Sequence, residues 1–279
     1  MVNIKDLDPT SSEWAPFGVQ LRRSREAAKL TQAQLAKLVG CNPSYVSYVE
    51  LATRPPSAKF ARLADKHLET GGTLNLMWWQ HKNTALLEGF PEFAGYEAQA
   101  AEIRLFAIGV VPGLLQATEY ATAWESGNVR RGSANQKEAD ERVSFLIARQ
   151  QSLERTPPPL VHAVLDESCL RRPIGGPDVM VAQLQHLEHL AKQPSVVIQL
   201  APYSLGEDRP YSYPVTLLTM PDRKVLGYTE TEQRGYLDRA AESVAPLVRD
   251  YDRLQIEALN QAASVAMIRR VREELEDGR

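Results

Sequence analysis

Residues 30–55 read LTQAQLAKLVGCNPSYVSYVELATRP, and their pattern indicates how the N-terminal part of the chain folds. Thr31 is a good helix N-cap, and the eight residues after it form a compact helical segment that ends at Gly40. Asn42 is a second N-cap, followed by a proline at the first helical position, and its helix extends to Glu50. Two short helices joined by a glycine-containing turn predict a helix-turn-helix unit.

Further helices are expected on both sides of this unit. Phe17 and Leu21 are spaced for one buried helix face, which leaves Arg22 for solvent. Ser57 caps a fourth helix, and residues 74–80 form a fifth. The N-terminal domain is therefore expected to be a bundle of about five helices.

Changes in pattern and charge divide the chain. Residues 1–16 lack hydrophobic periodicity and are expected to form an arm, residues 17–82 the helix-turn-helix domain, and residues 90–279 a second domain. Residues 1–82 contain 11 Lys and Arg against 7 Asp and Glu, a net charge of +4, whereas residues 83–279 contain 21 against 28, a net charge of −7. A basic head on an acidic body suggests an anionic partner for the head.

The composition excludes several classes of protein. Hydrophobic residues make up 43% of the 279 residues and charged residues 24%, which argues against a disordered chain. No apolar run approaches the ~18 residues that a membrane span requires. The two cysteines, Cys41 and Cys169, can form neither a disulfide framework nor a cysteine zinc site. We therefore expect a cytoplasmic protein with no membrane partner.

The motif in residues 30–55 resembles the XRE family of phage repressor-like helix-turn-helix regulators. The resemblance covers about residues 17–80, because the helix start, the turn, the third helix and the trailing Arg54-Pro55 pair all fall in register. One departure is Leu51-Ala52-Thr53, where the family usually has a glycine that ends the third helix. The resemblance implies a DNA-binding regulator, and the departure concerns the exit from the third helix and not the fold.

In helix-turn-helix docking the third helix enters the major groove of double-stranded DNA, and its N-terminal side chains reach base edges. The resemblance points most strongly to Ser44 and Tyr48. For Tyr45 an ordinary solvated surface role is the alternative. Hydroxyls and tyrosines can meet donors or acceptors, so the sequence does not specify the operator. The candidates for base readout are Asn42, Ser44, Tyr45, Ser47 and Tyr48.

The resemblance also implies contacts to DNA phosphates. Gln32 stands where the family uses a side chain or a helix N-terminus to hold a phosphate. Thr31, Arg54 and Lys59 are expected to support it, with a solvated surface side chain as the alternative for Lys59.

Two further features of the head have structural explanations. The resemblance makes Glu50 the buried partner of an arginine on the first helix, namely Arg25, and the loss of either would leave an uncompensated charge. Trp78 and Trp79 are expected to pack between the two domains rather than to stack on bases.

After residue 90 the pattern becomes that of a mixed α/β domain. The expected fold class is therefore mainly α with an α+β C-terminal part. Strands are expected over residues 101–108, 160–165 and 195–200, with a hairpin from 214–219 and 224–229. Helices are expected over 135–153, 177–192 and 238–276, the last with a break near Ser264.

Residues 90–275 resemble a second family, the C-terminal domain of WhiJ-like actinobacterial regulators. The resemblance rests on Val111-Pro112-Gly113-Leu114-Leu115-Gln116 with Glu119-Tyr120-Ala121, on residues 171–177 and on the long C-terminal helix. It implies an antitoxin-like regulator, a type that often works with a small cognate partner protein, and it implies no known ligand or activity.

Nothing in the body indicates an enzyme or a cofactor. His186 and His189 lie three residues apart on one helix, but no third ligand has recognisable spacing, so no metal is expected. Asp166 and Glu167 end a strand with no nucleophile or base marked nearby, and Cys169 is expected to be an ordinary cysteine. Gly175 and Gly176, with Arg171 and Arg172, could cradle an anion, but a plain loop before a helix explains them more simply.

The leading hypothesis is a non-enzymatic, sequence-specific DNA-binding transcriptional regulator that acts as a homodimer. Its C-terminal domain would dimerise, sense a small-molecule effector or bind a partner protein. The alternative is an antitoxin-like protein that acts mainly by binding a small cognate partner protein. An enzyme tethered to DNA is a third hypothesis, and no catalytic motif supports it.

Overall fold

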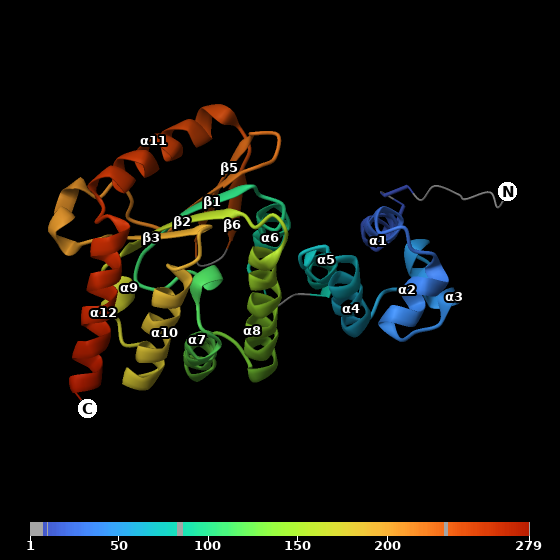
Figure 1. Ribbon diagram of the computed structural model, residues 1–279, viewed down its shortest axis with the longest axis horizontal. Helices are drawn as coiled ribbons and strands as arrows, with labels where there is room; N and C mark the ends of the chain where they lie inside the picture. The colour runs from blue at the N-terminus through green and yellow to red at the C-terminus, as the bar shows by residue number, and fades with distance from the viewer. Residues whose placement is uncertain (1–7, 10, 83–85, 232–233, 279) are drawn as a thin grey trace. The chain divides into compact units, whose positions relative to one another are not determined.

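The computed structural model describes residues 8–9, 11–82, 86–231 and 234–278, and its contacts divide the chain into two compact units. Figure 1 shows the helices of unit 1 and the helices and strands of unit 2. The predicted fold class, a helical N-terminal region followed by a mixed α/β domain, is confirmed. Unit 1 comprises Met1–Thr84 and Gln151–Thr156, and unit 2 comprises Ala85–Gln150 and Pro157–Arg279.

Unit 1 is a bundle of short helices whose ends are set by local side chains. The Thr31 hydroxyl accepts a hydrogen bond from the backbone N–H of Gln34 at 3.2 Å, and the Gln34 side chain accepts the N–H of Thr31 at 2.8 Å. Asn42 and Ser57 cap the next two helices with their side-chain oxygens. The helices are α1 (Ala15–Ala27), α2 (Gln32–Val39), α3 (Pro43–Glu50), α4 (Ala58–Leu68) and α5 (Thr73–Lys82).

The core of unit 1 holds α3 close to α1. Phe17, Leu35 and Val46 are completely buried together in this core. Gly18 of α1 allows the close approach, because a Cβ atom there would lie only 2.7 Å from the carbonyl oxygen of Val49. Helix α3, which carries the candidate base contacts, therefore packs closely against the rest of the bundle.

Two features of unit 1 differ from expectation. Helix α1 begins at Ala15, within the stretch expected to be an arm, and Trp14 packs against the core with its ring edge-to-face to Phe17. Trp78 also packs against the core of unit 1, and its indole N–H donates to the carbonyl of Pro56 at 2.9 Å. Trp78 is thus a structural residue of unit 1 itself.

Unit 2 is built on a six-stranded sheet with the order β3-β2-β1-β4-β5-β6. The first three strands in this order are parallel to one another, and the remaining pairings are antiparallel. Leu105, Ala163 and Ile198 share one row across the parallel strands, and all three are buried. The strands are β1 (Glu102–Ala107), β2 (Leu160–Asp166), β3 (Val196–Ala201), β4 (Val215–Thr219), β5 (Val225–Glu230) and β6 (Gly235–Asp238).

Helices cover both faces of this sheet (Figure 1). Helix α11 crosses one face, where Tyr251 and Leu254 pack with Phe106 and Val164. Helices α7, α8, α10 and α12 lie on the other side. Burial on both faces explains why the parallel strands read as short apolar runs. The helices are α6 (Phe90–Glu97), α7 (Thr118–Arg130), α8 (Gln136–Gln150), α9 (Ser168–Arg171), α10 (Pro177–Leu190), α11 (Ala241–Glu257) and α12 (Gln261–Asp277), with 3-10 turns η1 (Gly113–Leu115), η2 (Gln151–Glu154) and η3 (Tyr203–Asp208).

The break in the C-terminal helical region falls at residues 258–260 and not near Ser264. The N–H of Leu259 donates to the carbonyl of Leu200 in β3 at 2.9 Å, which pulls the chain out of the helix. Asn260 then caps α12 by accepting the N–H of Ala263 at 2.9 Å. Ser264 lies buried inside α12, where its hydroxyl accepts the N–H of Leu200 at 3.0 Å.

Among the described residues, no helix is both long enough and apolar enough to cross a membrane.

Candidate nucleic-acid interface

The turn between α2 and α3 presents the first turn of α3 at the surface of unit 1. Helix α2 ends at Gly40, whose φ of 70° lies in the left-handed region that favours glycine. The Asn42 side-chain oxygen accepts the N–H of Ser44 at 3.1 Å and so fixes the start of α3. These local contacts hold the two helices in a helix-turn-helix arrangement.

Polar side chains remain accessible along the outer face of α3. Asn42 and Ser44 are exposed, and the Ser44 hydroxyl donates to the Asn42 side-chain oxygen at 2.7 Å. Tyr48 lies one turn beyond Ser44 on the same face and is 49% exposed. Ser47 is half-buried beside it. A hydroxyl, an amide and a phenol therefore face outward where a base edge would lie.

Tyr45 is directed into unit 1 rather than toward a DNA base. Its hydroxyl accepts the N–H of Ser57 at 3.0 Å and donates to the carbonyl of Pro55 at 3.3 Å. Its ring packs edge-to-face on Phe60, with 5.2 Å between the ring centroids. Tyr45, which the sequence predicted as a base contact, therefore has a structural role that the sequence did not indicate: it ties α3 to the loop that leads into α4.

Tyr45→Phe is expected to lower the free energy of unfolding of unit 1 by about 1 kcal/mol, because the N–H of Ser57 loses its acceptor. The variant should still discriminate between DNA sites as the wild type does. Urea unfolding and DNA titration of the same preparation measure the two effects. A loss of discrimination with unchanged stability would return Tyr45 to the set of base contacts.

The candidate phosphate contacts fall into two groups. Thr31, Arg54 and Lys59 are exposed, and the Arg54 guanidinium lies over the Tyr45 ring, 5.1 Å from its centroid. Gln32 is half-buried instead, and its amide nitrogen donates to the Glu50 carboxylate at 2.7 Å. An amide has two N–H donors, so only one is left for a phosphate. Gln32 thus has a structural role that its position in the sequence did not reveal.

The Glu50 carboxylate joins three helices inside unit 1 although it is completely buried. Arg25 of α1 donates to it through Nε at 2.5 Å and through Nη2 at 3.0 Å, the pair expected from the sequence. Its hydrogen bond to Glu50 raises the pKa of Arg25. Arg22, which the sequence pattern assigned to solvent, is only 14% exposed, and its Nε lies 3.7 Å from the same carboxylate. With Gln32 of α2, these contacts fix the position of α3.

The exit from α3 uses a conformation that favours glycine although the residue is alanine. Ala52 has a φ of 54°, in the stretch where the sequence departs from the XRE pattern. Ala52→Gly is expected to raise the free energy of unfolding of unit 1 by about 0.5–1 kcal/mol, since glycine removes this backbone strain. The matched control is Ala33→Gly in α2, which should lower it by about 1 kcal/mol. Equal destabilisation by both variants in urea unfolding would contradict this account.

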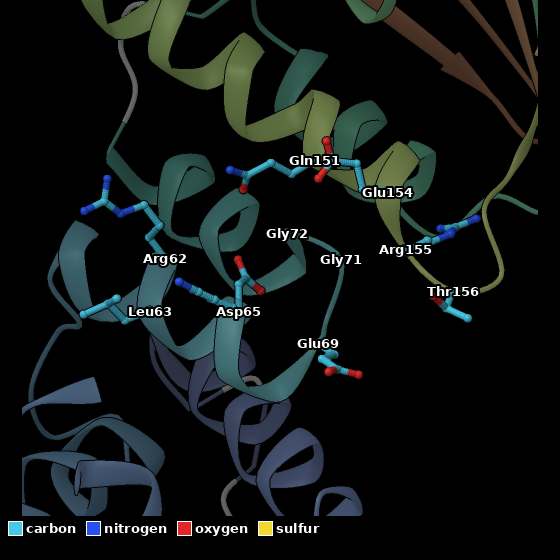
Figure 2. Close-up of a pocket in the computed structure, with 11 residues that line it drawn as sticks. Arg62, Leu63, Asp65, Glu69, Gly71, Gly72, Gln151, Glu154, Arg155 and Thr156 are labelled. Atoms are coloured by element: carbon cyan, nitrogen blue, oxygen red, sulfur yellow. The ribbon is translucent and has the colours of Figure 1, made fainter. Parts of the chain in front are cut away.

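A second feature of unit 1 is the hollow in Figure 2, which has a volume of about 710 Å³. Asp65 in its wall accepts the N–H groups of Leu74 and Asn75 at 2.9 and 2.7 Å, so it caps α5, and burial raises its pKa. Three basic and three acidic side chains line the hollow, so its charge favours neither an anionic nor a cationic ligand. The charged lining residues are Arg62, Lys66, Arg155, Asp65, Glu69 and Glu154.

The two carboxylates at the end of β2 in unit 2, Asp166 and Glu167, are held by neighbouring groups. Asp166 accepts from Arg209 at 2.5 Å. Glu167 accepts the N–H of Tyr203 at 3.0 Å and pairs with Arg171 at 3.2 Å. These contacts explain both carboxylates as structural groups of the sheet edge.

The remaining candidates for chemistry in unit 2 also have structural surroundings. Burial raises the pKa of Cys169 to about 12, so its thiol stays protonated near neutral pH. Burial lowers the pKa of His186, and the described residues contain no group of three or more His, Cys, Asp or Glu that could hold a metal ion. Gly175 has a φ of 73°, and a Cβ there would lie 2.7 Å from the Cβ of Ala123. Backbone geometry therefore accounts for this glycine.

Two family models match the chain, one over the N-terminal part and one over the C-terminal part. Residues 16–75 match the model of a helix-turn-helix domain. Residues 90–270 match the model of a domain of unknown function, DUF5753. No curated protein and no solved structure matches the chain. The helix-turn-helix match supports DNA binding, while the second match assigns no activity to unit 2.

Proposed function

This chain belongs to the DUF5753 family, and because it also carries a helix-turn-helix domain, we propose that it is a sequence-specific DNA-binding transcriptional regulator. The observation that carries the proposal is the exposed polar face of α3, held in a helix-turn-helix arrangement by the buried Glu50 cluster. A recognition helix needs both a fixed position and exposed polar side chains, and α3 has both.

In the proposed complex, α3 enters the major groove and α2 crosses the DNA backbone. Ser44 and Tyr48 read base edges, with Asn42 and Ser47 beside them. Thr31, Arg54, Lys59 and the remaining N–H of Gln32 contact phosphates, which fixes the register on the duplex without reading sequence.

Unit 2 is proposed to regulate this binding without catalysing a reaction. The satisfied carboxylates and the protonated Cys169 favour a sensing or interaction role over an enzymatic one. The resemblance to WhiJ-like regulators supports the same role, which would be carried out in the cytoplasm.

We also propose that the protein binds DNA as a homodimer. One recognition helix contacts too few bases for high specificity, and two half-sites one helical turn apart supply the rest. Size-exclusion chromatography with light scattering tests this directly. A monomer both in free solution and on DNA would rule the dimer out.

The second candidate function is that of an antitoxin-like protein that acts mainly by binding a small cognate partner protein. The net charge of −7 over residues 83–279 supplies a surface for a basic partner. Co-purification from the native host distinguishes it from a small-molecule sensor: a stoichiometric small protein would favour this candidate.

The proposed function is tested by fluorescence anisotropy with the DNA upstream of the protein's own gene and a scrambled duplex, each at two salt concentrations. A sequence-specific regulator should bind the upstream DNA tightly, discriminate against the scramble and keep that discrimination at the higher salt. Weak and equal binding to both duplexes, abolished by salt, would contradict the proposal.

Two groups of variants should behave differently in the same assay. Ser44→Ala and Tyr48→Ala should each reduce discrimination between sites by about 1–3 kcal/mol, because they remove base contacts. Arg54→Ala and Lys59→Ala should weaken binding to all sites alike and reduce the salt dependence, because they remove phosphate contacts. Identical behaviour of the two groups would mean that α3 does not present the base-reading face.

A further inference from the structure

An apolar groove runs along α11 in unit 2. The groove has a volume of about 770 Å³ and is lined by α11 and by the turn between β4 and β5. Val225, Val244 and Val248 contribute to it, and Ala241 and Ala245 of the same lining are exposed. Small-molecule sites have volumes of roughly 300–1,000 Å³ and mostly apolar walls. The groove has the size and character of such a site.

The shape of this α11 groove favours an extended ligand. Its lining positions on α11 recur every three or four residues from Ala241 to Ile256, so they form one continuous stripe on the helix. At 1.5 Å per residue the stripe is about 22 Å long. Ile256 at its end is 78% exposed. Its apolar part runs from Ala241 to Val248, about 10 Å along the helix, and the charged positions begin at Arg249. A narrow apolar stripe that ends at charged side chains suits an alkyl chain with a polar head better than a compact ring system.

The rim of the α11 groove is strongly cationic although its domain is acidic. Its one carboxylate, Asp252, is already paired with Arg104 at 3.1 Å. Among the described residues, no carboxylate pairs with Arg223, Arg249 or Arg253. The cations that line the groove are Arg223, Lys224, Arg239, Arg249 and Arg253, of which Lys224 pairs with Asp222 and Arg239 pairs with Glu92.

Arg249 and Arg253 are four residues apart on α11, and like charges at this spacing repel one another. An anion held between them would remove the repulsion and gain charge-assisted hydrogen bonds. The two arginines therefore supply a place for the head group of a ligand whose apolar part lies along the stripe.

We propose that the α11 groove binds a single-chain amphiphilic anion, namely a fatty-acid carboxylate. Its alkyl chain lies along Val244, Ala245 and Val248, and its carboxylate is held by Arg249 and Arg253. This inference gives a ligand class to the sensing role proposed for unit 2. The binding of the fatty acid does not depend on that sensing role; only the effect of the bound ligand on DNA binding does.

Two other occupants fit the groove less well. An extended peptide would need free backbone groups, but β5 is paired on both edges, with β4 and β6. An anionic membrane surface would be repelled by the net charge of −7 over residues 83–279. A free amphiphilic anion needs neither backbone hydrogen bonds nor attraction to a whole membrane surface, and its carboxylate can pair with the arginines of the groove.

The test is isothermal titration of the full chain, without DNA, with octanoate, decanoate and dodecanoate in monomeric solution. The dissociation constant should fall about fourfold for each added CH₂ group that enters the groove. Dodecanol, which has the same chain and no charge, should bind at least tenfold more weakly. No binding of dodecanoate, or equal binding of dodecanol, would overturn the proposal, as would binding only to vesicles that contain anionic lipid.

Matched variants locate the ligand. Ala245→Trp fills the groove and should abolish dodecanoate binding, whereas Ala262→Trp, at an exposed position of α12 outside the groove, should bind normally. The double variant Arg249→Gln/Arg253→Gln should weaken binding at least tenfold. The control is Lys137→Gln in α8, where the lysine side chain is 85% exposed, and this variant should bind normally. Circular dichroism confirms that each variant is folded. Unchanged binding to folded Ala245→Trp would overturn the assignment to this groove.

DNA titration of the same proteins separates this inference from the proposed function. If dodecanoate fails to bind while the wild type discriminates between DNA sites, only the ligand class is wrong. If dodecanoate binds as described but the protein shows no sequence preference on DNA, the ligand site stands and the regulatory function fails.

Discussion

Glu50→Ala is expected to lower the free energy of unfolding of unit 1 by about 3–5 kcal/mol and to abolish sequence-specific DNA binding. The carboxylate is completely buried and accepts from Arg25 at 2.5 Å and from Gln32 at 2.7 Å. Its removal leaves the Arg25 guanidinium without its buried counter-charge, since only the exposed Glu26 remains beside it, and removes the contacts of α3 to Arg25 of α1 and Gln32 of α2. A loss of this size is comparable to the whole stability of many small domains.

Urea unfolding followed by tryptophan fluorescence measures this effect, since Trp14, Trp78 and Trp79 lie in unit 1 and only Trp124 lies in unit 2. The matched control is Glu26→Ala. Glu26 lies 3.4 Å from the same arginine, but its side chain is 55% exposed, so its loss should cost less than about 1 kcal/mol. If both variants lowered the free energy of unfolding equally, the burial of Glu50 would not explain its contribution to stability.

Glu97→Ala is expected to lower the free energy of unfolding of unit 2 by a similar amount, about 3–5 kcal/mol. Glu97 in α6 is 1% exposed and accepts from Arg149 of α8 at 2.7 Å. The guanidinium also lies 5.0 Å from the centroid of the Phe90 ring. Without Glu97, the largely buried guanidinium of Arg149 would remain among aromatic side chains with its main counter-charge removed.

Hydrogen exchange resolved by peptide assigns this loss to one unit. Exchange should accelerate in β1, α6 and α8 of unit 2, while peptides from α1 to α3 keep their wild-type protection. The control is Glu92→Ala in the same helix, because Glu92 pairs with Arg239 across two half-exposed side chains. Accelerated exchange throughout unit 1 would show instead that the two units unfold as one.

The helical framework of the DNA-binding face was predictable because its signals are local. Thr31, Gly40 and Asn42 act on backbone groups within a few residues of themselves, so their roles can be read from the sequence. Asn260 carries the same kind of signal at the start of α12, and it could have placed the C-terminal break correctly. Ser264, where the break was expected, instead lies inside α12 and accepts the N–H of Leu200 in β3.

Short elements with weak patterns were not predictable in the same way. The sequence-based assignment lacked α7, a helix of 13 residues, and it also lacked α6, α9 and β6, which span only 4–8 residues each. An element of that length has too few residues for a hydrophobic period, and it forms because a neighbour pairs with it or covers it. Strand β6, for instance, exists by virtue of its antiparallel pairing with β5.

The two-part organisation, the helix-turn-helix arrangement and the outward face of α3 could be predicted from the sequence, because capping and hydrophobic spacing act over one or two helical turns. The roles of Tyr45, Gln32 and Arg22 emerged from the folded structure. Each of these side chains could point to solvent or inward, and the choice depends on partners at Ser57 or Glu50 that the folded chain brings near. The α11 groove depends in the same way on the approach of one helix to a distant hairpin turn. Such long-range contacts have no local period, and so they appear only when the chain is folded.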